Sequence, residues 1–141
     1  MSYLWDTCVL SELGRPNRDP DVARYLASVP TQETWISAIT VGEIEFGIAR
    51  LLTGKRRTEL ESVMNTMLSE LSSRVLPVTA DVARVWAGIT AQGLNRGSTI
   101  QVADGLIAAT ALHHGLRVVT RNVKDFEPTG VVIINPWANE S

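Results

Sequence analysis

Short runs of consecutive apolar residues alternate along the chain with longer segments in which apolar residues recur every three or four positions. Apolar side chains at successive positions are typical of parallel strands that are buried on both faces. We predict five such strands, at residues 3–5, 34–37, 74–77, 116–120 and 131–134. The alternation of strands with helical segments predicts the α/β class, with helices on both faces of a central parallel sheet.

The helical segments are bounded by recognisable start and stop residues. Asp19 followed by Pro20 is a good helix start, and Pro30 ends that helix after Val29. Thr40 and Thr79 are expected N-caps of later helices, and Ser98 is a candidate for another. We predict helices at residues 7–14, 20–29, 40–54, 55–73, 80–95 and 102–112, the last closed by His113-His114-Gly115. No linker, repeat or low-complexity tract interrupts this pattern, so residues 1–141 are expected to form one domain.

Composition and charge restrict the functional class. The chain has 141 residues, 45% hydrophobic and 20% charged, with a net charge of −2. No apolar run reaches the ~18 residues of a membrane span, and the single cysteine, Cys8, excludes an internal disulfide or a cysteine-based zinc site. A reduced, cytoplasmic setting without membrane contact is expected. Any nucleic acid would have to be held by local basic groups rather than by bulk charge. The candidates are Arg15 and Arg18, the run Lys55-Arg56-Arg57, and Arg121 with Lys124.

The helix at residues 102–112 contains the most unusual acidic residue. Its side chains are apolar nearly all the way round, which predicts burial, yet Asp104 lies in its first two turns. No Lys or Arg lies within a helical turn of Asp104. A buried carboxylate without a basic partner is costly unless it is hydrogen-bonded or holds a metal.

Three further acids are expected near Asp104, because ligands of open parallel sheets bind outside the carboxyl ends of the strands. Asp6 follows the first strand, Glu43 begins the helix after the second, and Asp125 follows the fourth. Two carboxylates ~5 Å apart repel by roughly 3 kcal/mol at an effective dielectric constant of about 20. A pocket of oxygen ligands suits a hard cation, so Mg²⁺ or Mn²⁺ is the expected cofactor.

Each of these acids also has a plain structural interpretation. Asp6 could cap the helix that follows it, and Asp125 could be a solvated loop residue. Thr40-x-x-Glu43 matches a capping box, in which the glutamate bonds back to the N-cap amide. Asp104 could face water or a backbone amide.

Five segments of the chain together resemble a known family. Their sequences are LWDTCVLSE at 4–12, ITVGEI at 39–44, ADGLIAATA at 103–111, TRNVKDF at 120–126 and NPW at 135–137. In this order they resemble the PIN-domain ribonucleases, most of all the VapC/FitB-type toxins of bacterial toxin–antitoxin pairs. The resemblance implies a sheet of about five parallel strands, Mg²⁺- or Mn²⁺-dependent RNA cleavage and a cognate antitoxin.

The resemblance also implies the roles of the acidic residues. Asp6, Glu43 and Asp104 match the family's acidic positions, with Asp6 and Asp104 holding the metal and Glu43 binding it or orienting water. The family usually has asparagine where this chain has Cys8, and some members place their fourth acid where this chain has Asn122. Asp125 is the nearest carboxylate, so we predict that Asp125 completes the metal site, with Asn122 as the alternative.

The expected partners follow from the same resemblance. They are the RNA substrate, a second copy of the chain in a homodimer, the antitoxin, and operator DNA only through the antitoxin. We expect the antitoxin in an apolar groove bordered by the helix at 55–73, where Met64, Met67 and Leu68 lie on one face. Two rival hypotheses are a non-catalytic binding module of the same fold and, less favoured, a phosphoaspartyl enzyme using Asp6.

Overall fold

A five-stranded parallel sheet forms the centre of the computed structural model, which describes residues 1–137. The strand order is β3-β2-β1-β4-β5, with β1 between β2 and β4. Leu4 of β1 pairs with Trp35 of β2 on one side and Val118 of β4 on the other. The strands are β1 Tyr3–Trp5, β2 Thr34–Ser37, β3 Val75–Leu76, β4 Arg117–Val119 and β5 Ile133–Ile134. The predicted fold class and all five predicted strands are confirmed.

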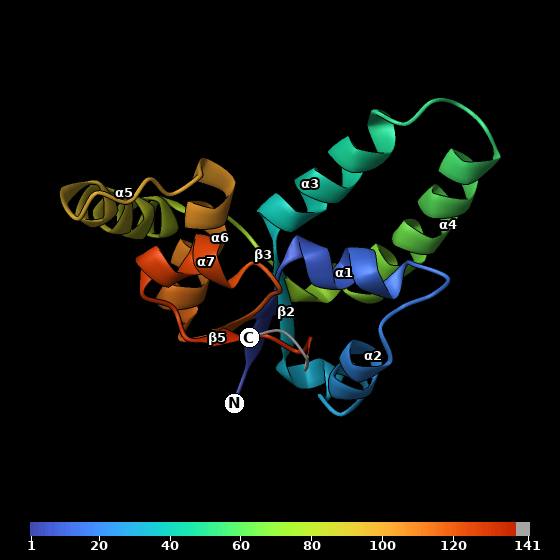
Figure 1. The fold of residues 1–141 in the computed structure, drawn as a ribbon, viewed down its shortest axis with the longest axis horizontal. Coiled ribbons are helices and arrows are strands. Elements are labelled where there is room, and N and C mark those ends of the chain that lie inside the picture. Colours follow the sequence, from blue (N-terminus) through green and yellow to red (C-terminus); the bar gives the residue numbers. More distant parts are fainter. Residues whose placement is uncertain (138–141) are drawn as a thin grey trace.

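Helices follow the strands in the predicted order, and α3 and α4 form a hairpin that projects from the body (Figure 1). The α-helices are α1 Thr7–Leu13, α2 Pro20–Ala27, α3 Ala38–Ala49, α4 Lys55–Glu70, α5 Ala80–Asn95, α6 Val102–His114 and α7 Val123–Phe126. Short 3-10 turns occupy Thr31–Glu33, Ser72–Arg74 and Glu127–Thr129. None of the helices in this part of the chain is both long and apolar enough to cross a membrane.

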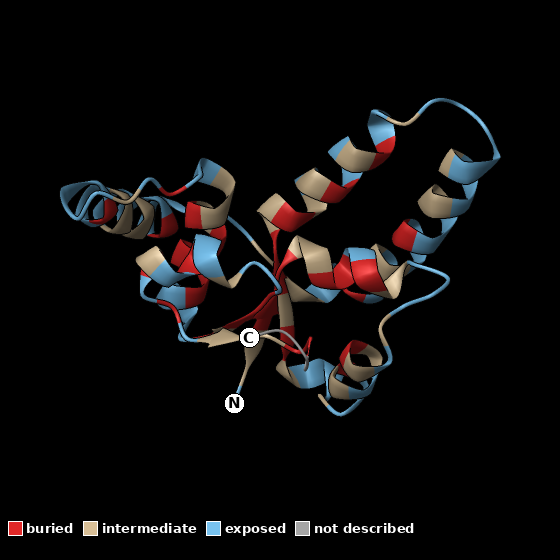
Figure 2. Ribbon diagram, in the orientation of Figure 1, coloured by how far each residue is buried: buried red, intermediate tan, exposed pale blue. Residues whose placement is uncertain are grey.

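Two apolar clusters cover the two faces of the sheet, because successive strand residues point to opposite sides. Trp5 and Val119 pack on one face in a cluster with residues of α1 to α4. Their neighbours Leu4 and Val118 pack on the other face, together with residues of α6 and α7. Burial is greatest along the strands and on the helix faces turned toward them (Figure 2). The two clusters hold the loops at the carboxyl ends of the strands in fixed positions.

The start of α3 corrects the predicted capping box. The helix begins at Ala38, and its N-cap is Ser37, whose hydroxyl accepts a hydrogen bond from the Ile39 amide at 3.0 Å. Thr40 is already inside the helix and fully buried. Glu43 therefore lies in the second turn, where it cannot bond back to the N-cap amide, and the capping-box interpretation is wrong.

The start of α6 differs from the prediction in a similar way. Its N-cap is Gln101 without a side-chain bond, not Ser98. Asp104 lies in the first turn and is half-buried rather than fully buried. Gly115 ends the helix as predicted, in the left-handed conformation with φ of 67°.

The remaining differences concern element ends. The helix α2 ends at Ala27 instead of Val29, and α4 ends at Glu70 because a 3-10 turn follows it. The segment after β4 forms the short helix α7 rather than an open loop, and it carries Asp125.

Candidate functional site

Asp6 is the most enclosed of the four predicted acids. It directly follows the central strand β1 and is only 3% exposed. One carboxylate oxygen accepts a hydrogen bond from the Thr7 amide at 2.8 Å, so Asp6 does cap α1. The other oxygen accepts one from the Thr120 hydroxyl at 2.8 Å. Burial raises the pKa of Asp6, which these hydrogen bonds partly counteract, and the charge of Asp125 raises it further.

Cys8 belongs to the same hydrogen-bond network and is more than a packing residue. Its Sγ lies 3.6 Å from the second oxygen of Asp6 and accepts a hydrogen bond from the Arg121 amide at 3.5 Å. Burial, followed by the charge of Asp6, raises the pKa of the thiol to about 11. Cys8 is therefore a neutral thiol near neutral pH and can donate a weak hydrogen bond to Asp6.

Glu43 is joined to the segment around Asp6 by a single residue, Thr7. The Thr7 hydroxyl donates a 2.6 Å hydrogen bond to the Glu43 carboxylate, while its backbone amide bonds to Asp6. The two acids are thus oriented by the backbone amide and the hydroxyl of one residue, although they lie far apart in the sequence. Glu43 is half-buried.

The charges of the other three acids act on Asp104. Burial raises its pKa to about 6, and the charges of Asp6, Asp125 and Glu43 raise it in that order. None of the four acids forms a salt bridge with a basic side chain within residues 1–137. In the same residues, no group of three acidic, cysteine or histidine side chains is assembled closely enough to form a ready-made metal site. The structure brings the predicted acids into electrostatic contact without a basic partner.

Other ionisable side chains lie away from the four acids. His113 and His114 are at the opposite end of α6 from Asp104, with their rings in a T-shaped contact at 4.9 Å. Of the basic candidates, Arg15 pairs with Glu12, and Arg57 pairs with Glu61. Thr7 and Thr120, which orient the acids, were not predicted. The signal for Thr120 was available, because it directly follows β4 at the sheet edge where Asp6 follows β1.

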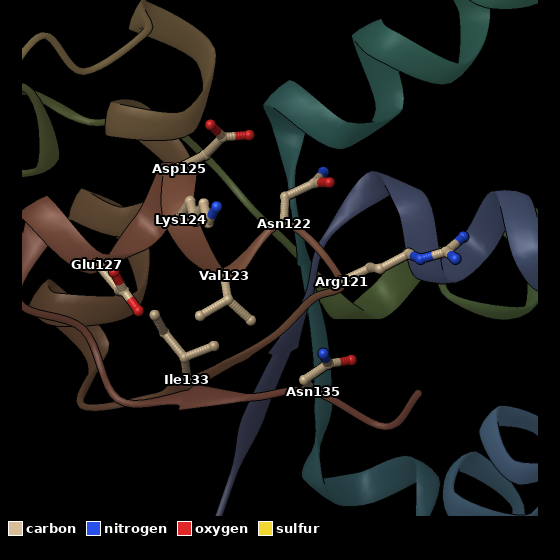
Figure 3. A pocket seen from close by; sticks show the side chains of 8 residues that line it. All are labelled: Arg121, Asn122, Val123, Lys124, Asp125, Glu127, Ile133 and Asn135. Atoms are coloured by element: carbon tan, nitrogen blue, oxygen red, sulfur yellow. The ribbon is translucent and has the colours of Figure 1, made fainter. Parts of the chain in front are cut away.

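Two hollows adjoin the acids. The larger, with a volume of about 680 Å³, lies beside the loop from β4 to α7, and we call it the β4–α7 pocket. Figure 3 shows its lining side chains, including Asp125, and the side chains of Val123 and Ile133 approach each other within it.

The smaller hollow, about 200 Å³, lies between α1, α3 and α4, and we call it the α3–α4 groove. Thr7 and Glu43 line the groove, so an occupant would reach the acids directly. Met64 also lines it but is only 3% exposed, while Met67 and Leu68 pack against the core. The groove is therefore where we expected it beside α4, but Met67 and Leu68 belong to the core instead of lining it.

Comparison with known proteins gives a consistent result. Residues 3–130 match the family model of the PIN domain. The VapC ribonuclease Y4jK of Sinorhizobium fredii is 42% identical over 133 residues, which cover 94% of this chain and 95% of that protein. Toxin FitB of Neisseria gonorrhoeae is 39% identical over 135 residues, covering 95% and 97%. A chain in the solved structure of FitAB bound to an IR36 DNA fragment superimposes with a TM-score of 0.90 at 38% identity, covering 99% of this chain and 98% of that one.

Proposed function

The chain belongs to the PIN-domain family, and from that premise we propose that it is a metal-dependent endoribonuclease, the toxin of a bacterial toxin–antitoxin pair. The observation that carries the proposal is the link through Thr7 between Asp6 and Glu43, together with the charges of the other acids acting on Asp104. The similarity to a VapC ribonuclease and to toxin FitB over nearly the whole chain supports RNA as the substrate.

The donor set fits Mg²⁺ or Mn²⁺. Carboxylate oxygens are the ligands that these hard cations prefer, and none of the four acids forms a salt bridge within residues 1–137. We propose Asp6 and Asp104 as direct ligands, Glu43 as a ligand or the group that orients water, and Asp125 as the fourth acid. When bound, the cation supplies a Lewis acid that lowers the pKa of a water molecule and offsets the charge developing on the phosphodiester.

The residues around the acids act by holding them in position. Hydrogen bonds from Thr7 and Thr120 fix both oxygens of Asp6, so its carboxylate cannot rotate freely. The Thr7 hydroxyl orients Glu43 in the same way. Fixed carboxylates lose little further freedom when a cation or substrate binds, which is the main contribution of such a supporting shell.

The rival hypothesis is a binding module that keeps the fold without the chemistry. Incubating the purified protein with mixed RNA, with and without Mn²⁺, separates the two. We expect fragments only with the metal, whereas a binding module would leave the RNA intact in both.

Asp125 and Asn122 can be distinguished as the fourth metal-site residue. We expect Asp125→Ala to weaken Mn²⁺ binding measurably and Asn122→Ala to have the smaller effect. The reason is that the charge of Asp125 reaches both Asp6 and Asp104. Titration calorimetry with Mn²⁺ measures both affinities, and the reverse order would give the role to Asn122.

The α3–α4 groove is the proposed antitoxin site, and Gly47 provides a test. A Cβ at Gly47 would meet nothing within 4 Å, so Gly47→Phe should fill the groove without disturbing α3. We expect it to keep RNA cleavage but to lose inhibition by the antitoxin encoded with it. Gly88→Phe in α5, where a Cβ is equally unobstructed, is the matched control. Inhibition that survives Gly47→Phe would place the antitoxin elsewhere.

We also propose that the protein is a homodimer and that it contacts operator DNA only through the antitoxin. The solved structure of FitAB bound to a DNA fragment supports only that a related complex binds DNA. Light scattering at micromolar concentration tests the first, and a monomeric mass would contradict it.

A further inference from the structure

The β4–α7 pocket has a chemistry of its own beside the acids. We propose that it binds one unstacked base of single-stranded RNA next to the phosphate that is cut, an inference that rests on the proposed function. The pocket holds about 680 Å³, within the ~300–1,000 Å³ typical of small-ligand sites. It shares Asp125 with the acidic site, so an occupant of the pocket lies next to the proposed catalytic residues.

The interior of the pocket combines an apolar surface with two side-chain amides. Val123 and Ile133 approach each other across it and offer a surface for the flat face of a base (Figure 3). Asn122 and Asn135 lie beside them. Amide side chains can both donate to and accept from the edge of a base, and RNA is read by sequence mainly through unpaired bases.

Hydrogen bonds fix the orientation of this polar edge. The side-chain oxygen of Asn135 accepts a 3.0 Å bond from the Trp137 amide. Only the oxygen of the Asn135 amide can accept, so its nitrogen is left to donate into the pocket. The side chain of Asn122 has no hydrogen-bond partner within residues 1–137. The pocket thus offers one oriented donor and one adaptable amide.

A short chain of hydrogen bonds ties the pocket to the acids. The Asn122 backbone amide donates to the Thr120 hydroxyl at 3.0 Å, and that hydroxyl donates to Asp6 at 2.8 Å. The backbone of the residue that would read the base is therefore held by the same hydroxyl that positions a proposed metal ligand. These hydrogen bonds would keep the phosphate that is cut at a fixed position beside the acids whenever a base occupies the pocket.

The charged side chains that line the pocket are two basic residues and two acidic ones, Asp125 and Glu127. Arg121 and Lys124 both line it, and the guanidinium carbon of Arg121 lies 5.5 Å from the centre of the Trp137 ring. With a net charge of −2, the protein does not hold RNA by its overall field. A phosphate next to the bound base would contact Lys124.

The first experiment fills the pocket and measures RNA binding without cleavage. Fluorescence anisotropy with labelled single-stranded oligoribonucleotides is measured in the Asp104→Asn background. Val123→Trp should weaken binding by about tenfold, equivalent to about 1.4 kcal/mol, because the indole occupies the space of the base. Leu94→Trp, at an exposed position on α5, is the matched control and should bind like its parent. Equal binding by the two tryptophan variants would overturn the inference.

The second experiment tests base recognition with a variant that leaves packing untouched. Asn122 is exposed and its side chain is unbonded, so Asn122→Ala should fold normally. We expect the parent protein to bind an oligoribonucleotide with bases about tenfold more tightly than its abasic counterpart. Asn122→Ala should reduce that ratio. An abasic oligomer that binds as tightly as the complete one would show that only the backbone is bound.

These outcomes are separable from failure of the proposed function. If the wild-type protein cuts RNA while the pocket variants bind like the parent, the pocket inference is wrong and the nuclease proposal stands. If the wild-type protein neither cuts nor binds RNA, the proposed function itself is wrong and the pocket inference falls with it.

Discussion

Replacing Asp104 with asparagine is expected to lower metal-dependent RNA cleavage by about a hundredfold or more. A bound cation contributes several kcal/mol to a phosphoryl transition state, and each ~1.4 kcal/mol changes the rate about tenfold. The charges of the other three acids act on Asp104, so losing its carboxylate should weaken metal binding by the four acids together. Growth arrest on expression should disappear together with cleavage. Cleavage at nearly the wild-type rate would show that Asp104 is not part of the active site.

The same substitution should stabilise the metal-free protein. The pKa of Asp104 is raised from 3.8 to about 6 in the folded state. Between these values the folded state binds more protons than the unfolded one, so the free energy of unfolding falls as pH rises through that window. An asparagine at this position does not titrate and would avoid this loss. In chelator, the melting temperature of Asp104→Asn should exceed that of wild type at about pH 7, and the difference should shrink toward about pH 4. A lower melting temperature at neutral pH would contradict the cost of the charged Asp104 carboxylate, which we attribute to burial first and to the neighbouring acids second.

The second large effect is expected for Glu43→Gln. Glutamine has the same length and can still accept the hydrogen bond that the Thr7 hydroxyl donates. Only the negative charge is lost, so we expect cleavage to fall by about tenfold or more. A bound metal stabilises a protein more when the metal is more concentrated or binds more tightly. Because the variant should bind Mn²⁺ more weakly, adding Mn²⁺ should raise its melting temperature by less than that of wild type.

Glu45→Gln is the matched control for Glu43→Gln. Glu45 lies on the same helix, is exposed and is separate from the acids. Glu45→Gln changes the net charge by the same amount as Glu43→Gln. It should leave the rate of cleavage and the rise in melting temperature on adding Mn²⁺ unchanged. If Glu43→Gln behaved in the same way, Glu43 would be a partner of Thr7 and no more.

The overall architecture was predictable because the strands are buried on both faces. Apolar runs such as Val118-Val119 place one residue in each cluster, so neither position tolerates a polar side chain. The placement of Asp6 was predictable for the same reason, because a parallel strand that ends in an acid directs it to the ligand-binding edge of the sheet.

Helix starts and supporting residues were not predictable from local patterns. Ser37 and Thr40 are both acceptable N-caps, and tertiary packing decides between them by burying Thr40 completely. The pairing of Thr7 with Glu43 joins residues 36 positions apart, and no sequence period indicates such a contact. The β4–α7 pocket likewise depends on how β5 returns beside β4, so that Asn135 and Asn122 line one pocket.

The most direct test of metal-dependent endonucleolytic cleavage uses a circular single-stranded RNA. A circle has no ends, so only an endonuclease can open it, and the first cut is seen as linear product on a denaturing gel. We predict linear product from the wild-type protein with Mn²⁺, none in excess chelator, recovery when Mn²⁺ is added back, and none from Asp104→Asn. Opening of the circle in chelator, or at an undiminished rate by Asp104→Asn, would contradict the proposed mechanism.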